Sequence, residues 1–194
     1  MGERGELGFL ATKLFCSLSY VKRLTISDNG LKLLSYQDDF PTSVPSFSNL
    51  IHLEVMSADM YDGYGRHDVG NLRYWIVRRI LLKFLHISPN LESLVFVGGF
   101  RHNGSTNNDG WSPDLIPQCL LLHLKSIEFR GFFWNQFEKD LIRLFLKNAR
   151  VLERVRITIS GRSSLSMNSN YKKQVIDEMS LFQRTSDECV LHVF

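Results

Sequence analysis

Cysteine is scarce in this sequence, and its distribution excludes two common kinds of small domain. The 194 residues include only three cysteines, Cys16, Cys119 and Cys189, which lie far apart. A secreted disulfide scaffold carries more cysteines in pairs, and a zinc site needs closely spaced ones. The odd number and wide spacing predict reduced thiols, buried or partly buried, in an intracellular protein of the cytoplasm or nucleus.

Long apolar runs and a strong excess of one charge are also missing. No run approaches the roughly 20 apolar residues of a membrane span, and the first six residues do not begin a secretory signal. The 23 Lys and Arg exceed the 20 Asp and Glu by a net charge of +3. The basic residues are spread along the chain, whereas nucleic-acid-binding domains cluster them. The sequence predicts neither a membrane nor a nucleic-acid partner.

A repeated pattern is the strongest positive signal. Five segments read apolar-x-x-apolar-x-apolar: Val21–Ile26, Leu50–Val55, Leu91–Phe96, Leu124–Phe129 and Leu152–Ile157. The last two apolar residues of each segment are two apart, so they point to one face of a strand. A single unit cannot bury that face, but stacked units form a continuous core. The pattern predicts an α/β fold, a leucine-rich-repeat-like curved solenoid of parallel strands with helices on the outer face.

Helical patterns lie between the repeats. The central apolar residues of successive repeats are 29, 41, 33 and 28 residues apart, which exceeds the usual repeat of about 20–29 residues at two places. In the longest interval, an apolar stripe over 72–86 predicts a helix that Asp68 caps and Ser88-Pro89 ends. Helices are also predicted over Gln136–Asn148 and Tyr171–Phe182, followed by a strand over Val190–Phe194.

Two groups of side chains have predicted environments. In the 136–148 helix, Phe137, Leu141, Leu144 and Phe145 are predicted to face inward, and the charged residues to stay in solvent: Glu138, Lys139, Asp140, Arg143 and Lys147. Several aromatic residues are predicted to fill the core or cap the repeats, with contact to a partner as the alternative; these are Trp75, Trp111, Phe132, Phe133 and Trp134.

Turn-forming residues crowd the stretch 98–117, which is predicted to be a surface loop and to mark a domain boundary. Residues 1–110 would form irregular leucine-rich repeats. Residues 111–194 would form a second unit that continues the same stack.

Catalytic and metal-binding motifs are incomplete. Gly65 and Gly70 have the spacing of a phosphate loop, but Asn71-Leu72 stands where that loop needs Lys and Ser or Thr. Asp59, Asp62, His67 and Asp68 follow no known metal-ligand spacing. The sequence predicts a polar loop here, with no cofactor, no metal and no enzyme activity. The alternative is an enzyme with its site in residues 61–70, acting through His67 or Asp68.

Three segments from residue 111 onward form a recognisable pattern: Trp111-Ser112-Pro113, the run from Pro117 to Phe132, and Glu138–Ile157, which contains the run Leu-Lys-Asn-Ala-x-Val-Leu-Glu. In these segments the sequence resembles the FBD domain of plant F-box proteins. Upstream, 20–27 and 47–54 resemble the leucine-rich repeats that precede this domain. The resemblance extends from about residue 14 to residue 194.

This resemblance implies a recognition function. In that family an F-box docks onto the adaptor of a cullin–RING ubiquitin ligase, and the repeats are thought to select the substrate. The Leu-Pro and Trp-rich pattern of an F-box is not found before the first repeat, so the resemblance extends to the recognition half only. It implies an unknown substrate protein as partner, with a cullin–RING ligase reached through another F-box protein. A decoy or stand-alone binding protein without a ubiquitin role is the alternative.

Strand alternation supplies the candidate binding residues. The position between the two last apolar residues of each repeat points away from the core. These positions are Thr25, Glu54, Val95, Glu128 and Arg156. They are predicted to line the exposed concave face and bind the partner, with simple solvation as the alternative.

Overall fold

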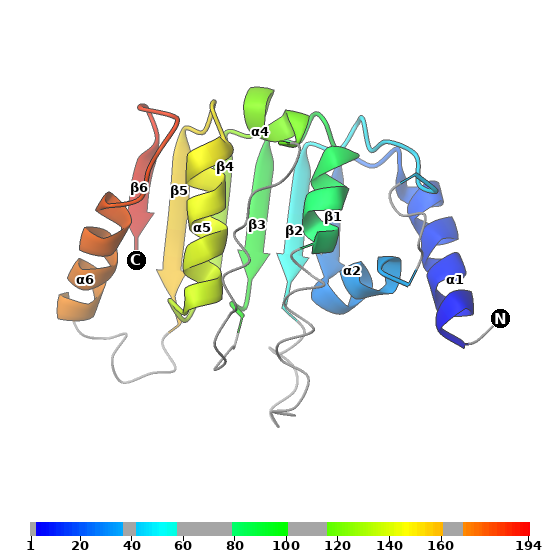
Figure 1. The fold of residues 1–194 in the computed structure, drawn as a ribbon, viewed down its shortest axis with the longest axis horizontal. Coiled ribbons are helices and arrows are strands. Elements are labelled where there is room, and N and C mark those ends of the chain that lie inside the picture. The colour runs from blue at the N-terminus through cyan, green and yellow to red at the C-terminus, as the bar shows by residue number, and fades with distance from the viewer. Residues whose placement is uncertain (1–2, 37–41, 58–78, 101–115, 161–168) are drawn as a thin grey trace.

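Six parallel strands form a single sheet in the order in which they occur in the sequence. The computed structural model describes residues 3–36, 42–57, 79–100, 116–160 and 169–194. Its sheet has the order β1-β2-β3-β4-β5-β6, with every neighbouring pair parallel (Figure 1). The bounds are β1 Arg23–Ser27, β2 His52–Met56, β3 Ser93–Val97, β4 Ser126–Phe132, β5 Arg154–Ile159 and β6 Val190–Val193. The alternating α/β class is confirmed, and the sequential strand order is that of a leucine-rich-repeat-like solenoid.

Helices connect the strands. Their bounds are α1 Glu3–Leu18, α2 Asp28–Leu34, α4 Gln118–Leu122, α5 Gln136–Asn148 and α6 Ser169–Ser180, and residues 79–86 are also helical. In Figure 1, α5 lies in front of the sheet near β4 and β5, whereas α1 and α6 flank its two ends. Within the described part of the chain, no helix is long and apolar enough to cross a membrane.

The backbone repeats one hydrogen-bond pattern from unit to unit. The carbonyl oxygens of Lys22, Ile51, Glu92 and Lys125 each accept two N–H groups from the next repeat, at 2.9–3.2 Å. Each of these residues directly follows the first apolar residue of its segment. The predicted segments are therefore structurally equivalent, and they stack through the same backbone contact.

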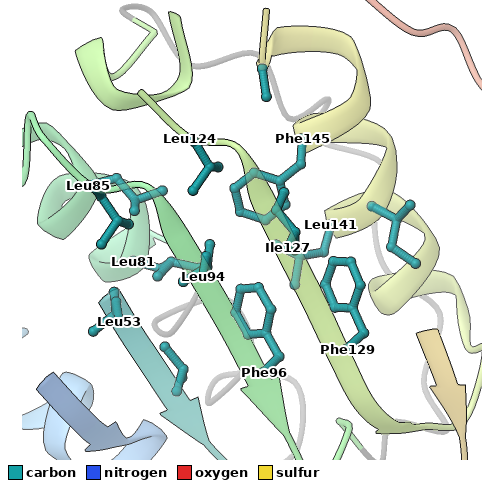
Figure 2. Close-up of a cluster of buried hydrophobic side chains, with 14 of the residues drawn as sticks. Leu53, Leu81, Leu85, Leu94, Phe96, Leu124, Ile127, Phe129, Leu141 and Phe145 are labelled. Carbon is teal, nitrogen blue, oxygen red and sulfur yellow. The ribbon is translucent and has the colours of Figure 1, made fainter. Parts of the chain in front are cut away.

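The core lies between the sheet and the helices. Leu53, Leu94 and Ile127 occupy matching positions on neighbouring strands, and Figure 2 shows them below side chains of α5 and of the 79–86 helix. Two residues further along β3 and β4, the rings of Phe96 and Phe129 stack with their centroids 5.2 Å apart. This distance follows the spacing of adjacent strands, about 4.8 Å. The two apolar positions of each repeat thus form two continuous rows.

Most predicted helices are confirmed, with shifts at their ends. The bounds of α5 are those predicted, and α6 begins and ends two residues before the predicted helix. The helix containing residues 79–86 stops before Ser88-Pro89, and the Ser88 hydroxyl donates to the Phe84 carbonyl at 2.9 Å. The predicted start of that helix, with Asp68, lies outside the described residues.

Helix α1 was not expected from the sequence. Ala11 and Phe15 face the core, Leu7, Leu10 and Leu14 are 47–61% exposed beside them, and Phe9, two positions before Ala11 and 48% exposed, lies on the other side. Apolar residues therefore surround the helix instead of forming the single stripe that marks an amphipathic helix. The short helices α2 and α4 were missed as well.

The thiols agree with the prediction of reduced cysteines. Cys119 and Cys189 are buried and Cys16 is partly buried, all three as free thiols. Burial raises the pKa of Cys119 to about 12, so this thiol stays protonated. Of the aromatic residues, Phe132 and Trp134 are buried and Phe133 is half-buried, whereas Trp75 and Trp111 lie outside the described residues.

The prediction that Glu138 stays in solvent is wrong, because its side chain is fully buried. Its carboxylate accepts the backbone N–H groups of Phe100 at 2.8 Å, Phe133 at 2.9 Å and Asn135 at 3.2 Å. Glu138 therefore ties the segments that follow β3 and β4 to the start of α5, where it also completes a capping box. Burial outweighs these hydrogen bonds and raises its pKa to about 7.

The close approach of these segments requires glycine at residue 99. Gly99 has a φ of +62°, and a Cβ there would stand 2.9 Å from Oε1 of Glu138. A larger residue would thus both strain the backbone and displace the carboxylate.

Candidate functional site

One face of the sheet is lined by the strand residues that alternate with the core residues. We call it the polar face. It comprises Arg23, Thr25 and Ser27 on β1, His52, Glu54 and Met56 on β2, Ser93, Val95 and Val97 on β3, Ser126, Glu128 and Arg130 on β4, Arg154, Arg156 and Thr158 on β5, and Val190 and His192 on β6.

The five candidate binding residues form one row across this face. Thr25, Glu54, Val95, Glu128 and Arg156 are successive partners in the strand register, and His192 extends the row on β6. The structure therefore brings all of them together, and the binding role assigned to them stays a prediction. Extending the alternation to the last strand would have found His192 from the sequence.

Their exposure differs along the row. Thr25 and Arg156 are exposed, and Glu54 and Glu128 are half-buried. Val95 is only 3% exposed, so the expectation that it lies open to solvent is wrong. Val95 stands on β3 between its register partners Glu54 and Glu128, and the guanidinium of Arg130 on β4 reaches across β3 to Glu54 on β2.

The middle of the polar face is internally paired. Nε and Nη2 of Arg130 donate to the two carboxylate oxygens of Glu128, each at 2.9 Å. Nη1 of Arg130 also lies 3.7 Å from Oε2 of Glu54. The hydrogen bonds from Arg130 hold the pKa of Glu128 below its ordinary value. One cation therefore fixes two carboxylates in this middle region.

A polar pair lies next to this network. Nδ1 of His52 is 3.1 Å from the hydroxyl of Ser93. Burial and the nearby charge of Arg23 lower the pKa of His52. At neutral pH this histidine is therefore neutral, and it adds a hydrogen-bonding group but no charge to the face.

The end of the polar face formed by β5 and β6 has a different character. Arg154, Arg156, Thr158, Val190 and His192 are all exposed. Among the ion pairs of the described residues, none involves Arg154 or Arg156. Arg154 was not predicted as a site residue, although it stands two positions before Arg156 and so on the same side of the strand.

The alternative enzyme site, with His67 and Asp68, lies outside the described residues, as do Asp59, Asp62 and the loop from Gly65 to Gly70. Within the part of the chain that the structure does describe, no group of three His, Cys, Asp or Glu side chains is placed to hold a metal ion.

The fold and the polar face define a class: a leucine-rich-repeat-like α/β solenoid in which each repeat presents side chains on a common sheet face. Comparison with known proteins gives the particular relationship. Residues 112–157, which include β4 and α5, match the family model of the FBD domain. Over most of its length the chain is distantly similar to plant F-box/FBD/LRR proteins.

The relatives are proteins of Arabidopsis thaliana. The chain is 27% identical to the putative F-box/FBD/LRR-repeat protein At3g49030, over 90% of this chain and 34% of the relative. It is 28% identical to the F-box/FBD/LRR-repeat protein At2g26030, over 89% and 34%. It is 24% identical to the FBD-associated F-box protein At5g27750, over 97% and 36%. The chain thus spans about a third of the length of these relatives, and no solved structure matches it.

Proposed function

We propose that this chain is a non-catalytic protein-interaction module that binds a partner protein through the polar face. The observation that carries the proposal is the register of the sheet: one side chain from each repeat stands in a single row across all six strands. A rigid array of this kind offers many separate contacts at fixed spacing, which suits recognition of a protein surface. Apart from the buried Val95, the side chains of the row are exposed or half-buried and lie outside the core.

The similarity to F-box/FBD/LRR proteins supports a more specific role. In this proposal the module corresponds to the part of a ubiquitin ligase subunit that selects the substrate, as the family resemblance implies. The partner is then a substrate protein inside the cell, and a cullin–RING ligase is reached through an F-box protein. The chain itself carries out no reaction, and a metal or cofactor has no part in the function.

The proposal is tested by neutralising the exposed row. A variant with Thr25→Ala, Glu54→Gln, Glu128→Gln and Arg156→Gln leaves the buried Val95 untouched. Affinity capture from plant extract followed by mass spectrometry measures the partners that the wild type and the variant recover. We expect the variant to lose its specific partners while its thermal unfolding stays cooperative, because the substituted side chains lie outside the core.

A matched control changes the formal charge by the same amount elsewhere. The substitutions Gln136→Ala, Arg150→Gln, Asp177→Asn and Asp187→Asn lie outside the polar face, and we expect the control to keep the partners. Unchanged recovery by the row variant would contradict the proposed function. Ligase adaptor and cullin are scored separately, since their recovery from purified components alone would contradict docking through another F-box protein.

A further inference from the structure

The charges of the polar face are unevenly distributed between its middle and its β5–β6 end. Four arginines and two glutamates stand on this face. Both glutamates lie in the middle, next to Arg130, and both oxygens of Glu128 accept hydrogen bonds from it. The positive charge that remains is therefore concentrated away from the middle, on Arg23 at one end and on Arg154 and Arg156 at the other.

Arg154 and Arg156 make a pair with a defined spacing. Two positions apart on β5, their side chains project from the same side of the strand about 6.6 Å apart. Neither forms an ion pair within the described residues. Glu128, the register partner of Arg156, accepts its hydrogen bonds from Arg130, and Arg156 acts on it only as a nearby charge. Both guanidinium groups are therefore available to a carboxylate from another molecule.

The surroundings of this pair suit a protein contact. Val190 is the register partner of Arg154 and is 53% exposed, and exposed His192 stands beside Arg156. Arginine is one of the residue types enriched at protein interfaces and among their energetically dominant residues. Arg23, at the opposite end, stands alone on its strand and lacks a second cation.

We propose that Arg154 and Arg156 bind an extended acidic segment of the partner protein, in which two carboxylates stand two residues apart. In an extended chain, side chains at positions i and i+2 point to the same side with a spacing of about 6.6–6.8 Å, so the segment matches the arginine pair. Each arginine then pairs with one carboxylate by charge-assisted hydrogen bonds. This inference rests on the proposed function and names the chemistry of the partner.

The test uses the full chain and three fluorescein-labelled peptides in a fluorescence-anisotropy titration. The probe is Ser-Thr-Glu-Val-Glu-Thr-Ser. One comparison peptide replaces both Glu by Gln, and the other has the same composition with adjacent glutamates, Ser-Thr-Val-Glu-Glu-Thr-Ser. We expect the probe to bind about tenfold more tightly than either, because adjacent carboxylates of an extended chain point to opposite sides. Raising the salt concentration should weaken the probe complex.

Charge reversal locates the binding. Arg154→Glu with Arg156→Glu is expected to weaken probe binding by at least about tenfold. The matched control, Arg150→Glu with Arg184→Glu, makes the same change in charge at two exposed arginines outside the polar face, and should stay within about twofold of wild type. Circular dichroism melting shows that both variants fold.

Three results would overturn the inference: no binding of the probe to wild type at about 1 mM, equal affinity for all three peptides, or an equal loss in the control. Affinity capture then separates the two proposals. If the row variant loses the partners but Arg154→Glu with Arg156→Glu keeps them, the acidic-segment inference fails and the proposed function stands. If both variants keep them, both proposals fail.

Discussion

The middle and the β5–β6 end of the polar face use the same residue type in opposite ways. Arg130 in the middle is bound by Glu54 and Glu128, whereas Arg154 and Arg156 have no ion-pair partner among the described residues. A cation that already holds two carboxylates must give them up before it can bind another molecule. Position on the sheet and neighbouring strands, not residue type, decide which arginines are available for binding.

The largest expected loss of stability comes from removing Glu138, which ties the segments that follow β3 and β4 to the start of α5. Glu138→Ala leaves the buried N–H group of Phe100 and the partly buried N–H groups of Phe133 and Asn135 without this acceptor. Each unsatisfied group costs about 1–3 kcal/mol, and loss of the buried charge offsets part of this, so we expect a destabilisation of about 3 kcal/mol. Urea unfolding measures it, with exposed Gln136→Ala on the same helix as the control. Equal stability of the two variants would contradict the role of Glu138.

The second expected effect, of similar size, is a dependence of the free energy of unfolding on pH. The pKa of Glu138 rises from about 4.5 in the unfolded chain to about 7 in the folded protein. Folding therefore takes up a proton between these values, and the contribution of Glu138 to stability falls by about 3 kcal/mol as the pH rises from 4.5 to 7. Well above pH 7, where the carboxyl group is ionised in both the folded and the unfolded protein, the contribution is constant.

The Glu138→Gln variant isolates this contribution, because it cannot titrate. The difference in unfolding free energy between wild type and variant should decrease from pH 4.5 to pH 7, as measured by urea unfolding at several pH values. A difference that is independent of pH would show that the carboxylate does not titrate in this window.

A smaller loss of stability is expected at the contact between α6 and the start of α5. The indole N–H of Trp134 donates to Oε2 of Glu178 at 2.8 Å, and Nζ of Lys139 binds the other oxygen at 2.8 Å. The ring also stacks on Phe182. Trp134→Phe keeps an aromatic ring but loses the hydrogen bond, so we expect a destabilisation of about 1 kcal/mol. Thermal unfolding measures this loss. The control is Leu181→Ala, at an 83% exposed residue, which should leave the unfolding temperature nearly unchanged.

The smallest effect on stability is expected in the middle of the polar face. Arg130 is largely exposed, so Arg130→Met should cost less than about 1 kcal/mol. The substitution has a clearer effect on the titration of Glu128. The pKa of Glu128 should rise, because the hydrogen bonds from Arg130 that lower this pKa are lost. NMR titration measures this shift. Arg156→Met keeps those hydrogen bonds and should raise the pKa of Glu128 less; an equal rise would contradict the assigned pairing.

Local sequence patterns predicted the repeats but not every environment within them. The spacing in each strand segment correctly gave the core positions, and the bounds of α5 followed from its apolar stripe. The same stripe placed Glu138 on the solvent-exposed side of the helix. Helical spacing cannot show that the segments after β3 and β4 approach the start of α5. Helix α1 was missed since its apolar residues, with Phe9 opposite Ala11 and Leu7, Leu10 and Leu14 half-exposed, do not form one narrow buried stripe.

The sequence by itself determined the repeat, the strand alternation and the row of candidate residues, because these depend on contacts between residues near in sequence and on one apolar face per unit. Only the tertiary structure decided that Val95 is covered, that Glu138 is buried, and that Arg130 is paired while Arg154 and Arg156 are not. Those outcomes depend on side chains that come together from different repeats, and the stacking of the strands sets their distances.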